Sequence, residues 1–144
     1  MTTNTTAHRP TVLITDDDDD ASRVIVKLLA KKDYRLLTAA SGPEALELLA
    51  REDVDVVVLD VMMPGMDGLE VCRRLHQEPR YAELPIILLT GLDDFKTRHE
   101  GMKLGVSQFM CKPFTRDELV ERIEAQLRVR RISHELDSIQ TRLD

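Results

Sequence analysis

The sequence contains no tryptophan, two tyrosines and three phenylalanines, so aromatic residues make up only 3% of the chain. A hydrophobic core must therefore be built from aliphatic side chains. The chain has 144 residues, which is enough for one domain with a single core and too few for two ordinary domains. Hydrophobic content of 42% and charged content of 32% are typical of a soluble globular chain.

Cysteine is also scarce. Cys72 and Cys111 are the two cysteines, and they lie far apart in the sequence without the spacing of paired ligands. This excludes a disulfide framework and a cysteine zinc site as interpretations of the pattern. We expect two reduced thiols in a cytoplasmic protein.

The chain lacks an excess of positive charge and a long apolar run. Its formal net charge is −6, whereas domains that bind nucleic acid usually carry a basic stripe, so we expect no direct DNA binding. No run approaches membrane-spanning length, and residues 1–10 are polar and rich in threonine, unlike a signal peptide. We predict a flexible N-terminal tail, a cytoplasmic location and no membrane association.

Apolar runs of strand length alternate five times with segments of helical periodicity. This alternation predicts an α/β fold in which helices cover both faces of a parallel sheet. The first, third and fourth runs are unbroken aliphatic segments and belong in the middle of the sheet, whereas the second and fifth carry polar residues and suit its edges. The strand order is therefore predicted as 2-1-3-4-5. The predicted strands are Val12–Thr15, Tyr34–Ala39, Val56–Leu59, Ile86–Leu89 and Ser107–Cys111.

The helices between these strands have recognisable start signals. Pro43 suits the first turn of one helix, Asp67 can cap the next, and Thr115 opens a capping box for the last. The segment around 95–104 is interrupted by Gly101, so it is predicted to be the least stable helix. The helix after the acidic run is expected to bury a stripe formed by Val24, Ile25, Leu28 and Leu29.

The pattern of the last helix continues past the point where a small domain should end. Apolar residues recur at alternating three- and four-residue spacing at Val129, Ile132, Leu136, Ile139 and Leu143. We predict a tail at residues 1–10, a domain at 11–128 and a helical extension at 129–144. The extension is interpreted as a pairing helix or a connector, with a solvated, frayed tail as the alternative.

Four sets of polar residues follow predicted strands. Asp16 and Asp17 follow the first, Asp60 the third, Thr90 the fourth and Lys112 the fifth. In an open sheet of this order, these strand ends face one crevice at the switch point between the first and third strands. Close carboxylates there repel by about 4 kcal/mol per pair at an effective dielectric constant near ~20, unless a cation lies among them. Carboxylate oxygens without histidine or cysteine favour Mg²⁺.

These residue types suit phosphoryl transfer. A carboxylate beside Mg²⁺ can attack phosphorus and form an aspartyl phosphate. Lys112 and the Thr90 hydroxyl could stabilise the charge on the transferring oxygens. Asp18, Asp19 and Asp20 are better explained as a helix N-terminus that is favoured by the helix dipole.

Four segments also carry a resemblance to a known family. They are the pair Asp16-Asp17, residues 57–68 (VVLDVMMPGMDG), residues 85–91 and residues 109–114 (FMCKPF). Over roughly residues 10–128, the chain resembles the receiver domain of two-component response regulators, whose fold is a flavodoxin-like (βα)5 three-layer structure. The motifs are highly specific in combination.

The resemblance assigns roles at the carboxylate site. It implies that Asp60 is the phosphorylated residue. Asp17 and Asp60 would bind Mg²⁺ together with the Met62 carbonyl, and Asp16 would act mainly through metal-bound water.

The resemblance also implies a switch. Thr90 and Phe109 would be the switch pair, with the hydroxyl turning toward the phosphoryl group and the ring moving inward behind it. Lys112 would pair with the phosphoryl oxygens, and the peptide bond between Lys112 and Pro113 is expected to be cis.

The function implied is phosphorelay signalling. A sensor histidine kinase or phosphotransfer protein would donate the phosphoryl group to Asp60, and the surface of the fourth helix, fifth strand and last helix would change its affinity for a partner. A homodimer formed through the last helix is also possible. The chain would catalyse only the acceptance and hydrolysis of its own phosphoryl group.

Two positions set an expectation for the lifetime of that group. Met62 and Leu92 stand two residues after Asp60 and Thr90, at positions that tune loss of the phosphoryl group in this family. Both are apolar and cannot orient a hydrolytic water, so we predict slow self-dephosphorylation. Thr15 stands where an aliphatic residue is more usual.

Three other functions remain as alternatives. A small Mg²⁺-dependent phosphohydrolase would use a nucleophilic aspartate after the first strand. Residues 92–131 also resemble receivers that precede domains for cyclic-dinucleotide synthesis or hydrolysis, so the chain could be the receiver part of such a protein. The stretch 133–136 (SHEL) resembles the phosphorylated-histidine box of sensor kinases over four residues only, and we interpret it as a chance match.

Overall fold

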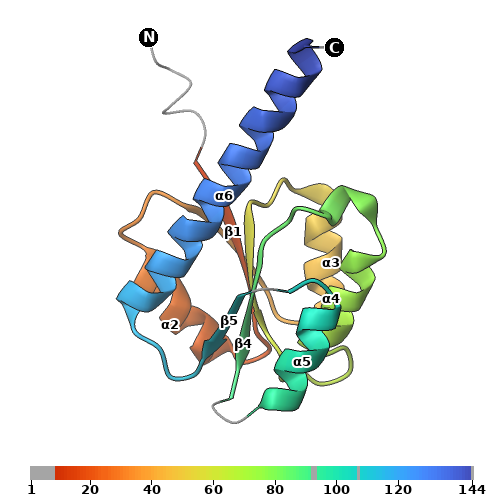
Figure 1. The fold of residues 1–144 in the computed structure, drawn as a ribbon. Coiled ribbons are helices and arrows are strands. Elements are labelled where there is room, and N and C mark those ends of the chain that lie inside the picture. The colour runs from red at the N-terminus through yellow and green to blue at the C-terminus, as the bar shows by residue number, and fades with distance from the viewer. Residues whose placement is uncertain (1–8, 92–93, 107, 144) are drawn as a thin grey trace.

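The computed structural model describes residues 9–91, 94–106 and 108–143, with side chains described up to residue 130 (Figure 1). The strands are β1 (Thr11–Thr15), β2 (Arg35–Ala39), β3 (Val56–Asp60), β4 (Ile86–Thr90) and β5 (Gln108–Cys111). The helices are α2 (Asp19–Leu29), α3 (Gly42–Arg51), α4 (Gly68–His76), the short 3-10 helix η1 (Pro79–Tyr81), α5 (Phe95–Lys103) and α6 (Arg116–Leu143).

The five strands form one parallel sheet in the order β2-β1-β3-β4-β5. The α/β fold class and the strand order predicted from the sequence are both confirmed. The central strands β1 and β3 are buried along their whole length, as their unbroken aliphatic sequences predicted. β2 and β5 lie at the edges and carry the more polar sequences.

Helices cover both faces of the sheet, so the core has two layers (Figure 1). On one face, α2 and α6 bury Ile25, Leu29, Leu119 and Ile123 against alternate residues of the sheet. On the other face, α3, α4 and α5 cover a second core cluster. The described core contains one aromatic side chain below a tenth exposed, Tyr34, and is otherwise aliphatic, with two methionines and Cys72.

The strand boundaries differ slightly from those predicted. β2 begins at Arg35, because Tyr34 is held in the preceding turn by a hydrogen bond from its N–H to the Lys32 carbonyl at 2.9 Å. β3 and β4 each extend one residue further than predicted, so that Asp60 and Thr90 are the last residues of their strands. Ser107 lies outside the described residues.

The predicted helix starts are present as hydrogen bonds. The Asp67 carboxylate accepts from the Glu70 N–H at 2.9 Å, and Pro43 lies in the first turn of α3. Thr115 and Glu118 form the reciprocal capping box of α6: the Glu118 N–H donates to Thr115 Oγ1 at 3.1 Å, and the Thr115 N–H donates to Glu118 Oε1 at 3.2 Å.

Two helices differ in detail from their sequence patterns, whereas the low stability expected of the segment around 95–104 stays a prediction. Gly101 does not interrupt α5, which continues to Lys103, because the glycine is buried against the sheet and the ring of Phe109 fills the space beside it. Val24 is 55% exposed and does not belong to the buried stripe of α2, which centres on Ile25 and Leu29.

α6 is the longest element, with 28 residues and a length of about 42 Å at ~1.5 Å per residue. Its first turns cover the sheet, and the rest projects beyond the edge at which the strands begin (Figure 1). The side chains of the predicted heptad residues after Val129 lie outside those described. No helix in the described part of the chain is long and apolar enough to cross a membrane.

Candidate functional site

The predicted polar residues meet at the edge of the sheet where the strands end. Thr15 of β1 pairs with Leu59 of β3, so Asp16 and Asp60, the next residues, lie side by side. The hydrogen-bond ladder of the parallel sheet therefore fixes the spacing of these two carboxylates.

Both of these carboxylates are buried. Asp16 is 2% exposed, and its Oδ1 accepts a hydrogen bond from the Asp18 N–H at 3.0 Å. Asp60 is 5% exposed, and its Oδ1 accepts a weak hydrogen bond from the Met62 N–H at 3.3 Å. Each carboxylate is thus oriented by a backbone group two residues further along the chain.

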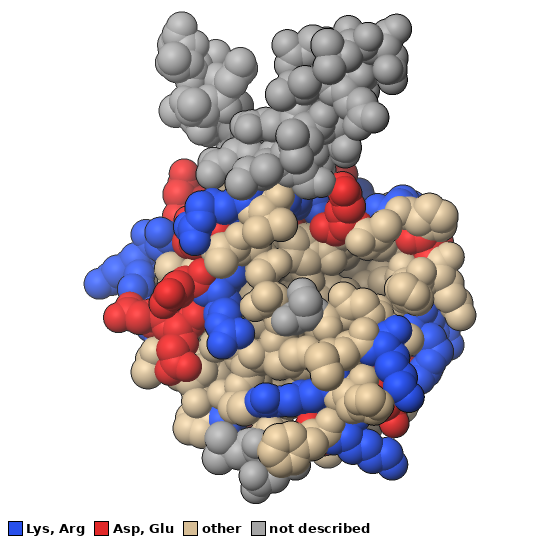
Figure 2. Space-filling model, in the orientation of Figure 1, with Lys and Arg blue, Asp and Glu red and all other residues tan. Residues whose placement is uncertain are grey.

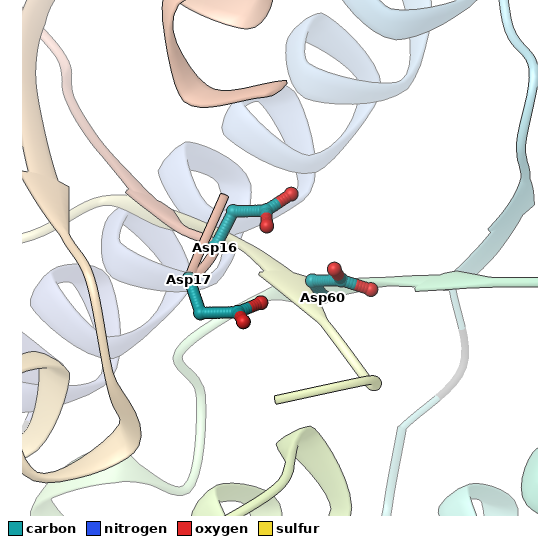
Figure 3. Close-up of side chains that lie close together, drawn as sticks. All are labelled: Asp16, Asp17 and Asp60. Atoms are coloured by element: carbon teal, nitrogen blue, oxygen red, sulfur yellow. The ribbon is translucent and has the colours of Figure 1, made fainter. Parts of the chain in front are cut away.

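Asp17 completes a group of three carboxylates. Its side chain is exposed, and one oxygen from each of Asp16, Asp17 and Asp60 lies within 4.8 Å of the others. Figure 3 shows the three carboxylates close together, coming from the ends of two neighbouring strands. One face of the group is open to solvent through Asp17, whereas the other two residues form its floor.

Lys112 places a positive charge on this group. Its Nζ lies 3.1 Å from Asp60 Oδ2 and 3.6 Å from Asp16 Oδ2. The Lys112 N–H donates to the Thr90 carbonyl at 3.0 Å, so the end of β4 fixes the backbone from which the lysine extends. The Lys112-Pro113 peptide bond is cis, as expected.

The environment shifts the pKa values of two of these groups. Burial, followed by the neighbouring charge of Asp60, raises the pKa of the Asp16 carboxyl, and this effect exceeds the opposing influence of the Asp18 N–H and of Lys112. Burial by itself would lower the pKa of Lys112, but the hydrogen bond and charge of Asp60 together with Asp16 outweigh it, and the pKa is raised.

The three carboxylates fit a hard divalent cation. Their oxygens are close enough to share one ion, and Asp16 Oδ2 is buried without a hydrogen-bond partner. A buried, unsatisfied carboxylate oxygen costs free energy, and a cation or its bound water would remove that cost. Oxygen ligands without sulfur or imidazole favour Mg²⁺ over zinc.

The predicted switch residues lie on one face of the sheet beside this group. Thr90 is 2% exposed, and its Oγ1 is buried without a hydrogen-bond partner. Phe109 pairs with Leu88, two residues before Thr90, so the side chains of Thr90 and Phe109 point to the same face of the sheet. The Phe109 ring is half-buried and packs against the core cluster beneath α5.

The structure brings in features that sequence reasoning missed. Gly68 begins α4 so close to Asp60 that a Cβ there would lie 2.6 Å from the Asp60 carbonyl oxygen. The sequence signal was its position after the capping residue Asp67. The role of the Asp18 N–H was hidden, because Asp18 also caps α2, as the acidic run predicted. The Met62 side chain is 74% exposed beside the site, and Leu92 lies outside the described residues.

The acidic residues after β4 do not form a second cluster in the described structure. Asp94 caps α5 by accepting a hydrogen bond from the Thr97 N–H at 3.1 Å, and Asp93 is not among the residues described. Within those residues, Asp16, Asp17 and Asp60 are the one group of three that could hold a metal ion.

Comparison with known proteins gives consistent matches. The sequence model of the response regulator receiver domain matches residues 12–124. Response regulator PleD of Caulobacter vibrioides is 38% identical over 125 residues, which cover 87% of this chain and 28% of PleD. The protein ycf27 of Cyanophora paradoxa is 40% identical over 117 residues, which cover 81% of this chain and 48% of ycf27. The chain thus spans less than half the length of these relatives.

Solved structures agree with the sequence matches. The receiver domain of the Francisella response regulator 1452 superposes with a TM-score of 0.75 at 32% sequence identity. The match covers 83% of this chain and 98% of that domain.

Proposed function

Because the chain belongs to the response regulator receiver domain family, we propose that it is a phosphorelay switch that accepts a phosphoryl group on Asp60. The donor would be the phosphohistidine of a sensor histidine kinase or of a phosphotransfer protein. The observation that carries the proposal is the position of Asp60 at the end of β3, where Lys112 Nζ lies 3.1 Å away and two further carboxylates adjoin it.

The chemistry follows from this arrangement. One carboxylate oxygen of Asp60 attacks phosphorus, the phosphorus–nitrogen bond of the donor breaks, and the imidazole leaves with the electron pair. Lys112 loses part of its pairing with Asp60 and follows the negative charge onto the phosphoryl oxygens. Asp17 and Asp60, together with Asp16 and the Met62 carbonyl, would hold Mg²⁺, which would supply further neutralisation of that charge.

The switch would act through Thr90 and Phe109. The unpartnered Thr90 hydroxyl is free to turn toward phosphoryl oxygens, which would give this buried group the hydrogen bond that it lacks. The phosphoryl group would then favour one of two packings of α5, β5 and α6.

The surface of these elements suits a partner. On α5, the side chains of Phe95 and Met102 are 75% and 58% exposed. Figure 2 shows a largely uncharged area in the middle of the face that includes α5 and α6, with Lys and Arg side chains around it. We propose that this surface transmits the signal, and that residues 129–144 are a pairing helix or a connector to an output domain.

The test is to identify the aspartate that becomes phosphorylated. The full chain would be incubated with acetyl phosphate and Mg²⁺, and the modified residue mapped by borohydride reduction and mass spectrometry. We expect one phosphoryl group on Asp60 that is labile to alkali and hydroxylamine, is lost in Asp60→Asn, is retained in the exposed control Asp53→Asn, and is absent when Mg²⁺ is chelated. Modification of Asp16 would instead support the phosphohydrolase alternative.

A further inference from the structure

Helix α5 contains a glycine, Gly101, that lies directly beside the ring of the predicted switch residue Phe109. Gly101 is buried, and a Cβ built on it would lie 3.0 Å from Phe109 Cε1 and 3.1 Å from Phe109 Cζ. The same Cβ would lie at an ordinary 3.5 Å from Leu88 Cδ2. A Cβ at position 101 would therefore be in tight contact with the edge of the Phe109 ring, which would have to give by a few tenths of an ångström.

The backbone gives no other reason for this glycine. Gly101 has no positive φ, unlike Gly65 and Gly105, so its conformation is open to any residue. A glycine in a helix interior lowers the helical equilibrium about fivefold relative to alanine, which corresponds to about 1 kcal/mol. The chain accepts this cost where the helix passes over Phe109.

The Phe109 ring lies inward, against the core cluster beneath α5. Phe109 packs with the core cluster under α5, and its strand pairs it with fully buried Leu88. Its backbone is fixed from the other side, because Arg122 Nη1 of α6 donates to the Phe109 carbonyl at 2.9 Å. Two elements of the proposed output surface, α5 and α6, therefore contact this one residue.

We propose that Gly101 is a positioning residue of the switch: its missing side chain makes room for the inward Phe109 ring and favours that arrangement. The role of Gly101 in a switch rests on the proposed function, whereas the steric conflict between a side chain at position 101 and the Phe109 ring does not. Phosphorylation would then complete the change at Thr90 in a domain whose ring is already inward.

The first test compares ring positions in the full chain without any phosphoryl analogue. With labelled phenylalanine rings and leucine methyl groups, NMR should show nuclear Overhauser contacts between Phe109 and Leu88 in the natural sequence. In Gly101→Ala, these contacts should weaken markedly, because the ring must move by a few tenths of an ångström or leave. Lys27→Ala, which changes an exposed residue of α2 on the other face of the sheet, is the control and should leave the contacts unchanged.

The second test measures coupling to the site. Beryllofluoride with Mg²⁺ is used as the phosphoryl analogue. If the inward position of the ring and the bound analogue favour each other, Gly101→Ala should weaken beryllofluoride binding about fivefold, which is at the low end of the coupling usually found between two sites. The bound analogue should in turn restore the Phe109–Leu88 contacts in this variant. Lys27→Ala should bind the analogue as the natural sequence does.

A double-mutant cycle separates steric conflict from helix stability. In a Phe109→Leu background, Gly101→Ala should raise the folding equilibrium constant about fivefold, which is the gain expected from the higher helix propensity of alanine. In the natural background, where Phe109 is present, Gly101→Ala should not give this gain. If Gly101→Ala does not fold but the double variant does, the conflict with the ring is established. Failure of both to fold would contradict the proposal.

Unchanged Phe109–Leu88 contacts in Gly101→Ala, or the full stability gain with Phe109 present, would overturn the inference. If beryllofluoride and Mg²⁺ do not bind the natural sequence at all, the proposed function fails instead. The comparison of ring positions without the analogue would still decide the role of Gly101.

Discussion

At the scale of single residues, Asp16 is a carboxylate that folding removes from water and places beside another carboxylate. Its Oδ1 keeps the Asp18 N–H, whereas its Oδ2 is buried without a hydrogen bond. Lys112 Nζ at 3.6 Å offsets only part of this cost, because it lies closer to Asp60. The site therefore holds unfavourable electrostatic energy, which a cation bound among these carboxylates would relieve.

This predicts a stabilising substitution. Because folding raises the pKa of Asp16, the folded chain keeps the Asp16 proton to a higher pH than the unfolded chain does. The free energy of unfolding therefore falls as the pH rises from the ordinary aspartate pKa to the pKa of Asp16 in the folded chain. In chelator at pH 7, Asp16→Asn should raise the free energy of unfolding by roughly 1 kcal/mol, measured by urea denaturation. Well below the ordinary aspartate pKa, the difference should vanish.

Asp16→Asn should also lose the stabilisation that we expect Mg²⁺ to give to the natural sequence. A ligand raises the free energy of unfolding only where it binds the folded chain, and the variant lacks one of the carboxylates of the site. Asp53→Asn, at an exposed position, is the matched control and should behave as the natural sequence does. A loss of stability in Asp16→Asn at pH 7 would contradict this view of the carboxylate group.

A second prediction at this scale concerns the lifetime of the phosphoryl group. The Met62 side chain is exposed beside Asp60 and has no group that can orient water. Self-dephosphorylation should be slow, and Met62→Glu should shorten the half-life by roughly tenfold, less than a fully positioned base would give. Loss of labelled phosphate over time measures it, with Met102→Glu on exposed α5 as control. A half-life of seconds in the natural sequence would refute the expectation.

At the scale of elements, α6 is fixed to the rest of the domain by polar contacts on the sheet face that it covers and at the edge where the strands begin. The Tyr34 hydroxyl donates to the Glu124 carboxylate, and Arg116 Nε donates to the Leu28 carbonyl at 3.0 Å. Where α6 leaves the sheet, Arg130 Nε pairs with Asp55 Oδ1 at 3.6 Å, and Asp55 Oδ2 accepts the Thr11 N–H at 2.8 Å. The direction of the projecting helix is thus set by the first and third strands.

The Tyr34 contact gives a prediction for α6. Tyr34→Phe leaves the half-buried Glu124 carboxylate without its donor and should lower the free energy of unfolding by about 1–2 kcal/mol. Burial and then the bond to Glu124 raise the pKa of Tyr34, so this contribution should be lost as pH rises above the ordinary tyrosine pKa. Denaturation at neutral and alkaline pH measures both effects. Tyr81→Phe is the control, and an equal loss there would refute the assignment.

The elements also show how far sequence reasoning reaches. Strand order followed from which apolar runs were unbroken, and the helix starts followed from Asp67, Pro43 and Thr115, because both signals are local in the sequence. The grouping of Asp16, Asp17, Asp60 and Lys112 followed from one rule, that parallel strands end at the same edge. These parts of the structure needed no knowledge of side-chain packing.

What the sequence did not reveal depends on packing between distant segments. Gly101 looks like a helix breaker until the ring of Phe109 is seen to fill its space, and Gly68 looks like an ordinary residue until Asp60 is seen behind it. Val24 has the spacing of a core residue, yet its side chain is 55% exposed. Each error comes from a contact that periodicity does not encode.

At the scale of the whole molecule, the carboxylate group and the projecting end of α6 lie at opposite edges of the sheet (Figure 1). A change at Asp60 therefore reaches the extension only through packed elements, of which β5 and α6 are directly bonded by Arg122 and the Phe109 carbonyl. This separation suits a domain that reports to a partner or a second copy rather than one that binds substrate and acts on it.

The oligomeric mass of the chain tests whether the extension at residues 129–144 is a pairing helix. If residues 129–144 pair, the intact chain should form a dimer by light scattering, more strongly with beryllofluoride and Mg²⁺, whereas the chain ended after Arg128 should remain a monomer. Leu136→Asp in the full chain, which puts a charge into the predicted seam, should have the same effect as truncation. A monomer under every condition would remove the pairing interpretation and favour docking to another partner.

We propose that occupation of Asp60 switches the packing beneath α5. The most direct measurement is an amide NMR titration of the ¹⁵N-labelled chain with beryllofluoride and Mg²⁺. The account predicts shifts at Asp60, at Thr90 and along β5 in the natural sequence, and none in Asp60→Asn. Shifts that stay confined to the loop after β3, or that persist in Asp60→Asn, would contradict it.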